Sequence, residues 1–135
     1  MSRLAARRAV MQMAYEQLLG GEGGEQTLHN LVSFSSDDLD DMQYINTLLN
    51  GIAREGSLLD QEIAARSTNR ALERIPLVVR AILRVALYEL QFLQDIPPSV
   101  VAEEAVELSK RFGEEGDSRF VNGLLGSYIR DHQGS

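Results

Sequence analysis

Several kinds of residue are absent or scarce in this chain. It contains no cysteine, and this excludes disulfides, thiolate metal sites and cysteine nucleophiles. Its longest apolar stretch, residues 77–93, is interrupted by charged side chains, which argues against a membrane span. Arg7 and Arg8 stand where a secretory signal would carry its apolar core. We therefore expect a soluble protein of a reducing, cytoplasmic compartment.

Motifs for catalysis and for metal or cofactor binding are also absent from the sequence. His29 and His132 are the only histidines, and neither belongs to a ligand or triad pattern. The glycines of 20–24 are not followed by the Lys-Ser/Thr pair of a phosphate loop. The acidic run at 37–41 is typical of a helix start. Three more carboxylates are typical of a solvated helix face: Glu103, Glu104 and Glu107. We therefore predict no cofactor, no metal and no enzyme.

The composition is that of one globular domain spanning residues 1–135. Hydrophobic residues make up 44% and charged residues 24% of the 135, so the apolar surface is sufficient to form a core. The net charge of −7 argues at first against a nucleic-acid ligand. The first fifteen residues, however, contain Arg3, Arg7 and Arg8 and no acid. Such an asymmetric chain can bind an anion at one end while its bulk stays acidic.

Apolar residues recur at helical spacing along the first half of the chain. Ser2 is a plausible cap for a first helix that ends near Leu19, before two glycines. A short second helix is predicted over 25–33. A third helix begins with the acidic run in its first turn, and its apolar stripe continues to Ile63 across a predicted break at Gly56-Ser57.

The second half begins with a helix that is apolar on almost every side, over 77–94, and a short turn of helix is predicted before it, over 71–75. This pattern is typical of a central helix with neighbours all round. Two prolines, at 97 and 98, then interrupt the chain, and Ser99 is the predicted cap of the next helix. Asp117 or Ser118 is the predicted cap of a last helix. The sequence therefore predicts an all-α bundle of six or seven helices around one buried helix.

Three stretches, in this order and spacing, resemble the signature segments of the NusB family of transcription antitermination factors. The first is RRAVMQMAY at 7–15, and the second is VRAILRVALYEL at 79–90, followed by Asp-Ile-Pro at 95–97. The third is EAVELSKRFG at 104–113 with FVNGLL at 120–125. The resemblance implies a compact all-α fold of two helical subdomains.

The resemblance also implies a function. It implies binding of the boxA element of nascent single-stranded RNA together with NusE, a ribosomal protein of the small subunit. In the family this assembly joins the RNA polymerase antitermination complex and suppresses termination, notably on ribosomal RNA operons.

Candidate contact residues follow from the matched segments. Arginines on an exposed helix end can reach phosphates or stack under an unpaired base. Those expected at the RNA are Arg3, Arg7, Arg8, Asp117, Ser118 and Phe120. Those expected at the protein partner are Tyr15, Val79, Arg80 and Phe112. By helical spacing alone the aromatic members are core residues, and Asp117 and Ser118 are helix caps.

Alternative functions remain open at this point. One is a protein–protein adaptor of the same fold with weakened or lost RNA binding. Another is the recognition module of an RNA-modifying enzyme, because a similar helical domain precedes some ribosomal-RNA cytosine methyltransferases. A homodimer that hides the basic first helix is a third arrangement compatible with the sequence.

Overall fold

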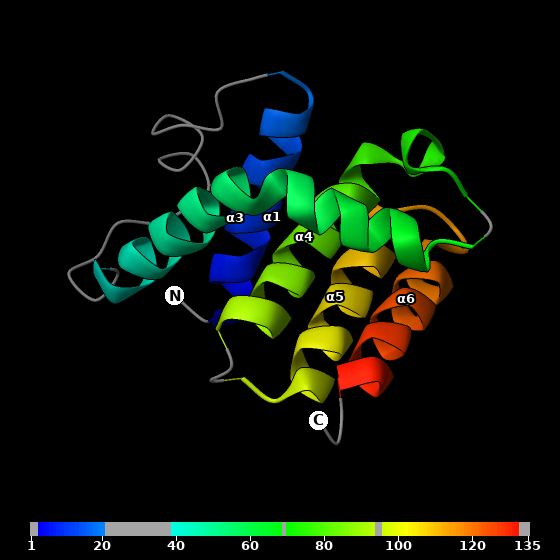
Figure 1. Ribbon diagram of the computed structural model, residues 1–135. Coiled ribbons are helices and arrows are strands. Elements are labelled where there is room, and N and C mark those ends of the chain that lie inside the picture. Colours follow the sequence, from blue (N-terminus) through cyan, green and yellow to red (C-terminus); the bar gives the residue numbers. More distant parts are fainter. Residues whose placement is uncertain (1–2, 21–38, 69, 94–95, 133–135) are drawn as a thin grey trace.

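The computed structural model of the protein describes residues 3–20, 39–68, 70–93 and 96–132 (Figure 1). All regular secondary structure in this part of the chain is helical, which confirms the predicted all-α class. It holds five α-helices and one short 3-10 helix, against the six or seven helices predicted. In chain order the elements are α1 (Arg3–Leu18), α3 (Leu39–Arg66), η2 (Leu72–Arg74), α4 (Leu77–Phe92), α5 (Pro98–Phe112) and α6 (Asp117–His132). The short helix predicted over 25–33, and His29 with it, lies outside the described residues.

The first helix is confirmed close to its predicted bounds. Gly20 follows α1 with a φ of 92°, the left-handed conformation in which glycine commonly ends a helix. Ala6, Ala9, Val10 and Met13 are buried. Because two of these side chains are small, α1 packs closely against α3 and α4.

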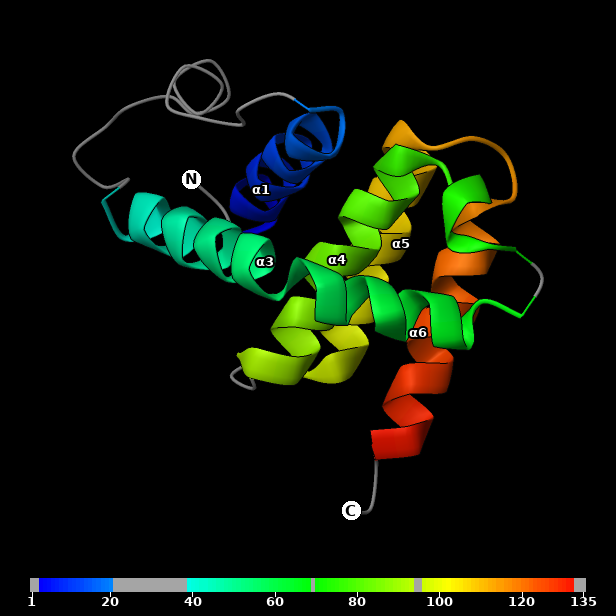
Figure 2. The same ribbon diagram turned by 45° about the horizontal axis from the view of Figure 1, so that its top comes forward.

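The helix α4 is the centre of the molecule, as its sequence predicts. It contacts α1, α3, α5 and α6. In Figures 1 and 2, α3 crosses over α4, with one half beside α1 and the other reaching α6. Nine residues of α4 are buried, and they cover several sides of the helix: Val79, Ala81, Ile82, Leu83, Val85, Ala86, Leu87, Tyr88 and Glu89. The all-round apolar pattern thus corresponds to neighbours on all sides.

The predicted break at Gly56 is wrong. The helix α3 runs without interruption through 28 residues, about 42 Å. Its two glycines instead allow α4 to approach: Gly51 lies against the ring of Tyr88, and Gly56 lies against the guanidinium of Arg84. The glycines therefore have a packing role that local propensity does not reveal.

Gly51→Ala is expected to lower the free energy of unfolding by about 1–3 kcal/mol, the usual cost of overpacking. A Cβ at this position would overlap the Tyr88 ring, which is itself buried and cannot swing away. The control is Gly123→Ala in α6, where a Cβ meets nothing within 4 Å. That change is expected to raise stability by about 0.5–1 kcal/mol through helix propensity. Urea unfolding of both variants checks the pair, and equal effects would contradict the packing argument.

Two smaller boundary predictions have different outcomes. The turn of helix expected before α4 is confirmed as η2. The predicted cap of α5 is wrong: Pro98 occupies the first turn and Pro97 the cap position, so Ser99 lies inside the helix. Proline is favoured at a helix start because the N–H that it lacks has no partner there.

Candidate nucleic-acid and protein interface

Arg7 and Arg8 are adjacent on α1 but have opposite environments. The Arg7 side chain is 4% exposed, and its Nε donates to both carboxylate oxygens of Glu89, at 2.9 and 2.8 Å. A terminal nitrogen of Arg7 also bonds to Glu104. The expectation that Arg7 lies on an exposed helix end is therefore wrong, since the core holds its guanidinium. The prediction that Glu104 belongs to a solvated face is wrong for the same reason.

The Arg7–Glu89 pair belongs to a network that joins four helices. The Tyr44 hydroxyl on α3 donates to Glu89 Oε2 at 2.9 Å, while Glu104 contributes from α5. Burial lowers the pKa of Arg7, but the hydrogen bond and charge of Glu89 outweigh it and leave the pKa raised. Burial raises the pKa of Glu89, and the bonds from Arg7 and Tyr44 offset this only in part. Arg7 is thus a fixed cation that positions α1 against the bundle.

Arg8, unlike Arg7, forms no ion pair with another of the described residues. It is partly buried, and its Nε is buried without a hydrogen-bond partner. Arg8, Gln12 and Tyr15 lie three to four residues apart, so they share one face of α1. The side chain of Arg3 lies outside the described part of the molecule.

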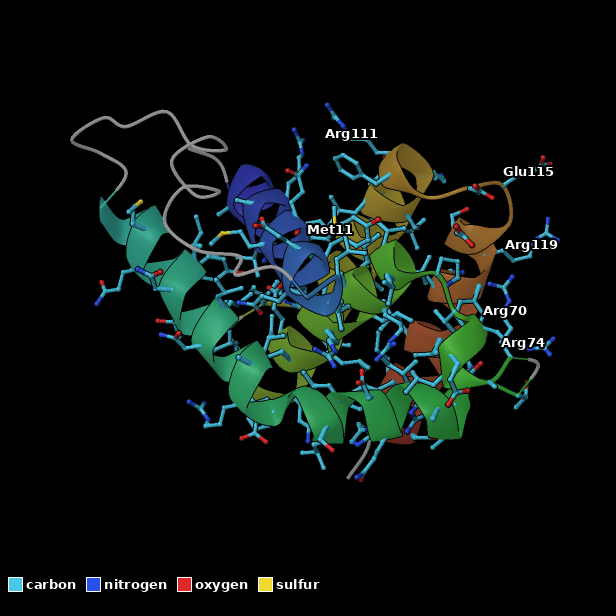
Figure 3. The ribbon with its side chains drawn as sticks, turned by 90° about the horizontal axis from the view of Figure 1, so that it is seen from above. Met11, Arg70, Arg74, Arg111, Glu115 and Arg119 are labelled. Atoms are coloured by element: carbon cyan, nitrogen blue, oxygen red, sulfur yellow. The ribbon has the colours of Figure 1, made fainter. Side chains whose placement is uncertain are left out.

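The Tyr15 face of α1 borders a groove of about 510 Å³. Its lining comes from α1 and the residue after it, from α4 and from α5: Met11, Gln12, Tyr15, Glu16, Leu19, Val78 and Phe112. Two predicted partner residues, Tyr15 and Phe112, are therefore brought together across the groove. Leu19 is 58% exposed, so apolar surface continues to the rim. Figure 3, a view from above, shows Met11 beside α1 and Arg111 pointing outward from α5.

The other two predicted partner residues do not reach the groove. Val79 is 0% exposed and faces the core, so the prediction that it contacts a partner is corrected. Its neighbour Val78 lines the groove instead, because successive helical residues point in directions about 100° apart. Arg80 lies on the α3 side of α4, where it bonds to Asp60 at 3.0 Å.

Asp60 also binds Arg84, through two hydrogen bonds of 2.9 and 2.5 Å. Burial acts to raise the pKa of Asp60, but these bonds and the two positive charges hold it below its usual range. Asp60, Arg80 and Arg84 therefore join α3 to α4, and the Arg80 guanidinium is hydrogen-bonded within the fold.

The start of α6 holds the remaining predicted RNA residues. Asp117 is 4% exposed, and its Oδ2 accepts the backbone N–H of Glu114 at 2.8 Å, so it closes the turn before α6. Ser118 and Phe120 are partly exposed. The Arg70 guanidinium lies 4.8 Å from the Phe120 ring centre. Asp117 is thus a buried turn residue, while Phe120 borders solvent beside an arginine.

Phe120 lines a second hollow, of about 570 Å³, between the end of α3 and α6. Three arginines also line it: Arg66, Arg70 and Arg119. The sequence reasoning missed these arginines. Their signal was the spacing of Arg66, Arg70 and Arg74, four residues apart, in a segment that precedes the central helix. Figure 3 shows Arg70, Arg74 and Arg119 on one edge of the molecule.

Among the described residues, no group of three or more histidine and carboxylate side chains is placed to hold a metal ion. None of the described helices combines the length and hydropathy that a membrane crossing requires.

Comparisons with known proteins identify a family model and relatives that match this chain. The model of the NusB family matches residues 2–130. The transcription antitermination protein NusB of Dehalococcoides mccartyi (strain CBDB1) is 35% identical over 126 residues, covering 93% of this chain and 88% of that protein.

Solved structures of other proteins have the same fold as this chain. T. maritima NusB superposes with a TM-score of 0.84 at 29% identity, covering 98% of this chain and 93% of that one. A crystal structure of the antitermination factors NusB and NusE in complex with dsRNA gives a TM-score of 0.80 at 24% identity, covering 96% and 97%. With a family model that spans nearly its whole length, this chain belongs to the NusB family.

Proposed function

We propose that this protein is a transcription antitermination factor. It binds boxA-type single-stranded RNA together with the small-subunit ribosomal protein NusE, and so joins the RNA polymerase antitermination complex. Family membership and the relatives named for antitermination support the role. The structure solved with NusE and dsRNA is 24% identical to this chain, and its likeness concerns the fold alone. Within this proposal the protein acts in the cytoplasm as one domain, by binding and not by catalysis.

The observation that carries the proposal is the apolar groove that borders the face of α1 carrying Arg8. Tyr15, Val78 and Phe112 offer aromatic and aliphatic surface of the kind that anchors a protein partner. Arg8 is partly exposed, and no ion pair joins it to another of the described residues. A protein seated in the groove thus lies next to a cation that can take an RNA phosphate.

The charge balance explains why RNA and partner bind together. With a net charge of −7 and Arg7 withdrawn into the core, the chain offers few phosphate contacts near α1. Each contact with single-stranded RNA contributes a slope of about −0.7 in the plot of log affinity against log salt. A few contacts give weak binding, so NusE supplies the remaining contacts to the RNA.

Arg8→Ala is expected to flatten the salt dependence of RNA binding by about 0.7 in that plot, because one phosphate contact is lost. The measurement is fluorescence anisotropy of a labelled boxA-type RNA across a salt series, with NusE present. The matched control is Arg54→Ala on α3, whose side chain is 66% exposed. It is expected to leave the slope unchanged.

Two outcomes would contradict the proposal in different ways. An Arg8→Ala slope equal to that of the wild type would remove Arg8 from the RNA surface. No RNA binding by the folded wild type, with or without NusE, would favour the protein–protein adaptor instead. The burial of Arg7 favours the protein–protein adaptor, because it reduces the free positive charge on α1.

A further inference from the structure

We propose that Thr68 is a regulatory phosphorylation site, whose phosphate is held by arginines lining the hollow between the end of α3 and the start of α6. A serine/threonine protein kinase transfers the γ-phosphoryl group of a nucleoside triphosphate to it. The Thr68 Oγ1 attacks the γ-phosphorus, the bond to the β-phosphate oxygen breaks, and the nucleoside diphosphate leaves. The hydroxyl proton passes to the catalytic carboxylate of the kinase.

Thr68 lies in the short connection between α3 and η2, where a kinase can reach it. It is exposed, and neither Thr68 nor Ser67 belongs to a helix. Ser67 uses its hydroxyl within the connection, where Oγ donates to the backbone oxygen of Arg70 at 2.7 Å. No hydrogen bond joins the Thr68 side chain to another of the described residues. Thr68 therefore offers a free hydroxyl to a phosphoryl donor.

Arginines surround Thr68 both in sequence and in space. In sequence, Arg66 stands two residues before it and Arg70 two residues after it. In space, the lining of the hollow includes Thr68 together with Arg66, Arg70 and Arg119. Figure 3 shows Arg70 and Arg119 on the same edge of the molecule. A phosphate opposite such a cluster gains about one to three charge-assisted hydrogen bonds, which guanidinium groups form in parallel pairs.

Two of the three arginines are available to the phosphate. Arg119 is exposed, and no ion pair or hydrogen bond joins its side chain to another of the described residues. The ion pair of Arg70 with Asp117 measures 3.8 Å, longer than a hydrogen bond, so Arg70 has donors to spare. Arg66 is a fixed wall of the hollow, because its guanidinium already bonds at 2.5–2.9 Å to Glu62, Ser127 and Asp131.

The phosphate changes this edge of the molecule in two ways. Because Arg119 belongs to α6, a phosphate that binds it links the connection after α3 to α6. The phosphate also brings a charge of about −1.5 to −2 at pH 7 into the hollow. Phe120, an RNA contact expected from the sequence, lines the same hollow. Phosphorylation therefore lowers RNA affinity, a consequence that rests on the proposed function, and leaves the groove at Tyr15 unchanged.

The first test places phosphothreonine at position 68 of the full chain through an expanded genetic code. The matched control carries it at position 47, an exposed threonine of α3 with no arginine within six residues in sequence. Titration followed by phosphorus NMR gives the second pKa of each phosphate, about 6 when no cation holds it. The pKa at position 68 is expected to lie at least about one pH unit below that at position 47, because guanidinium groups favour the dianion.

Two arginine variants of the phosphorylated protein identify the clamp. Arg119→Gln is expected to return the pKa of the phosphate at position 68 part of the way toward that of the control. Arg130→Gln changes an exposed arginine of the same helix about 16 Å away, and is expected to leave the pKa where it was. Equal effects of the two variants would overturn the role of Arg119.

The second test measures regulation. In the presence of NusE, phosphorylation at position 68 is expected to weaken binding of a boxA-type RNA and to flatten the log–log salt slope by about 0.7–1.4, the contribution of one or two phosphate contacts. NusE affinity without RNA is expected to stay unchanged. A phosphorylated protein that binds RNA as tightly as the unmodified one overturns the regulatory role.

The modification itself is sought by mass spectrometry of the protein purified from its own cells, during growth and in stationary phase. One phosphate at Thr68 is expected in at least one state, and Thr68→Val is expected to abolish it. No phosphate at Thr68 in either state, or equal pKa values at positions 68 and 47, overturns the proposal. A lowered pKa in a protein that binds no RNA keeps the phosphate clamp and overturns the proposed function.

Discussion

Arg7→Met is expected to lower the free energy of unfolding by about 3–5 kcal/mol, the usual result of removing one partner from a buried ion pair. The side chains of Arg7 and Glu89 are 4% and 1% exposed. Without Arg7, Glu89 keeps the Tyr44 hydroxyl as a donor but loses its neutralising charge. Burial already raises the pKa of Glu89, so an uncompensated carboxylate there is costly.

Urea unfolding followed by circular dichroism measures this loss. Arg54→Met, at a solvent-exposed position of α3, is the control and is expected to change stability by less than about 0.5 kcal/mol. The double variant Arg7→Met/Glu89→Leu is expected to recover much of the loss, because apolar replacement of a whole buried pair is often neutral. A loss below about 1 kcal/mol in Arg7→Met would mean that Arg7 is not a buried structural cation.

Tyr15→Ala is expected to weaken NusE binding roughly 30-fold, the effect of losing an aromatic anchor worth about 2 kcal/mol. Tyr15 lies in the groove opposite Phe112, beside apolar surface from α4. Its ring is partly buried, so it is held in place before the partner arrives. Isothermal titration calorimetry with purified NusE gives the change directly.

Two further variants make the groove test specific. Tyr15→Phe keeps the ring and is expected to bind NusE nearly as well as the wild type. Leu58→Ala removes an apolar side chain that is 45% exposed on α3, outside the groove, and is expected to have no effect on binding. Equal losses from Tyr15→Ala and Leu58→Ala would mean that the groove is not the partner site.

Much of the fold was predictable because its signals are local. The all-round apolar pattern of α4 identified the central helix before any contact was known, and glycine and proline gave the ends of α1 and α4. The uninterrupted course of α3 was not predictable from local propensity. Local propensity predicts a break at Gly56, whereas the packing role of Gly51 and Gly56 depends on Tyr88 and Arg84, which lie on a different helix.

The site was predicted less well, because charge pairing across the chain decides it. Arg7 and Arg8 look alike in sequence, and the carboxylate that withdraws Arg7 lies 82 residues away. A signal was nevertheless present: Arg7 shares a helix face with Val10 and Ala14, both buried. Glu89 in an otherwise apolar helix also required a cationic or donor partner.

The structure places the two aromatic residues predicted for the partner surface in the groove, but not the predicted valine. Tyr15 and Phe112 meet in the groove, while Val79 lies one residue from the position that lines it. A shift of a single residue turns a side chain by about 100°, and a matched segment alone does not fix that direction. Helix packing decides it.

The most direct test of the account is the affinity of the wild type for a boxA-type RNA with and without saturating NusE. Adjoining RNA and protein surfaces predict positive coupling, about 5- to 150-fold in the usual range, and RNA must tighten NusE binding by the same factor. This reciprocity is checked by titrating NusE into protein with and without RNA. An RNA affinity that NusE leaves unchanged, or a folded protein that binds no RNA at all, would contradict the account.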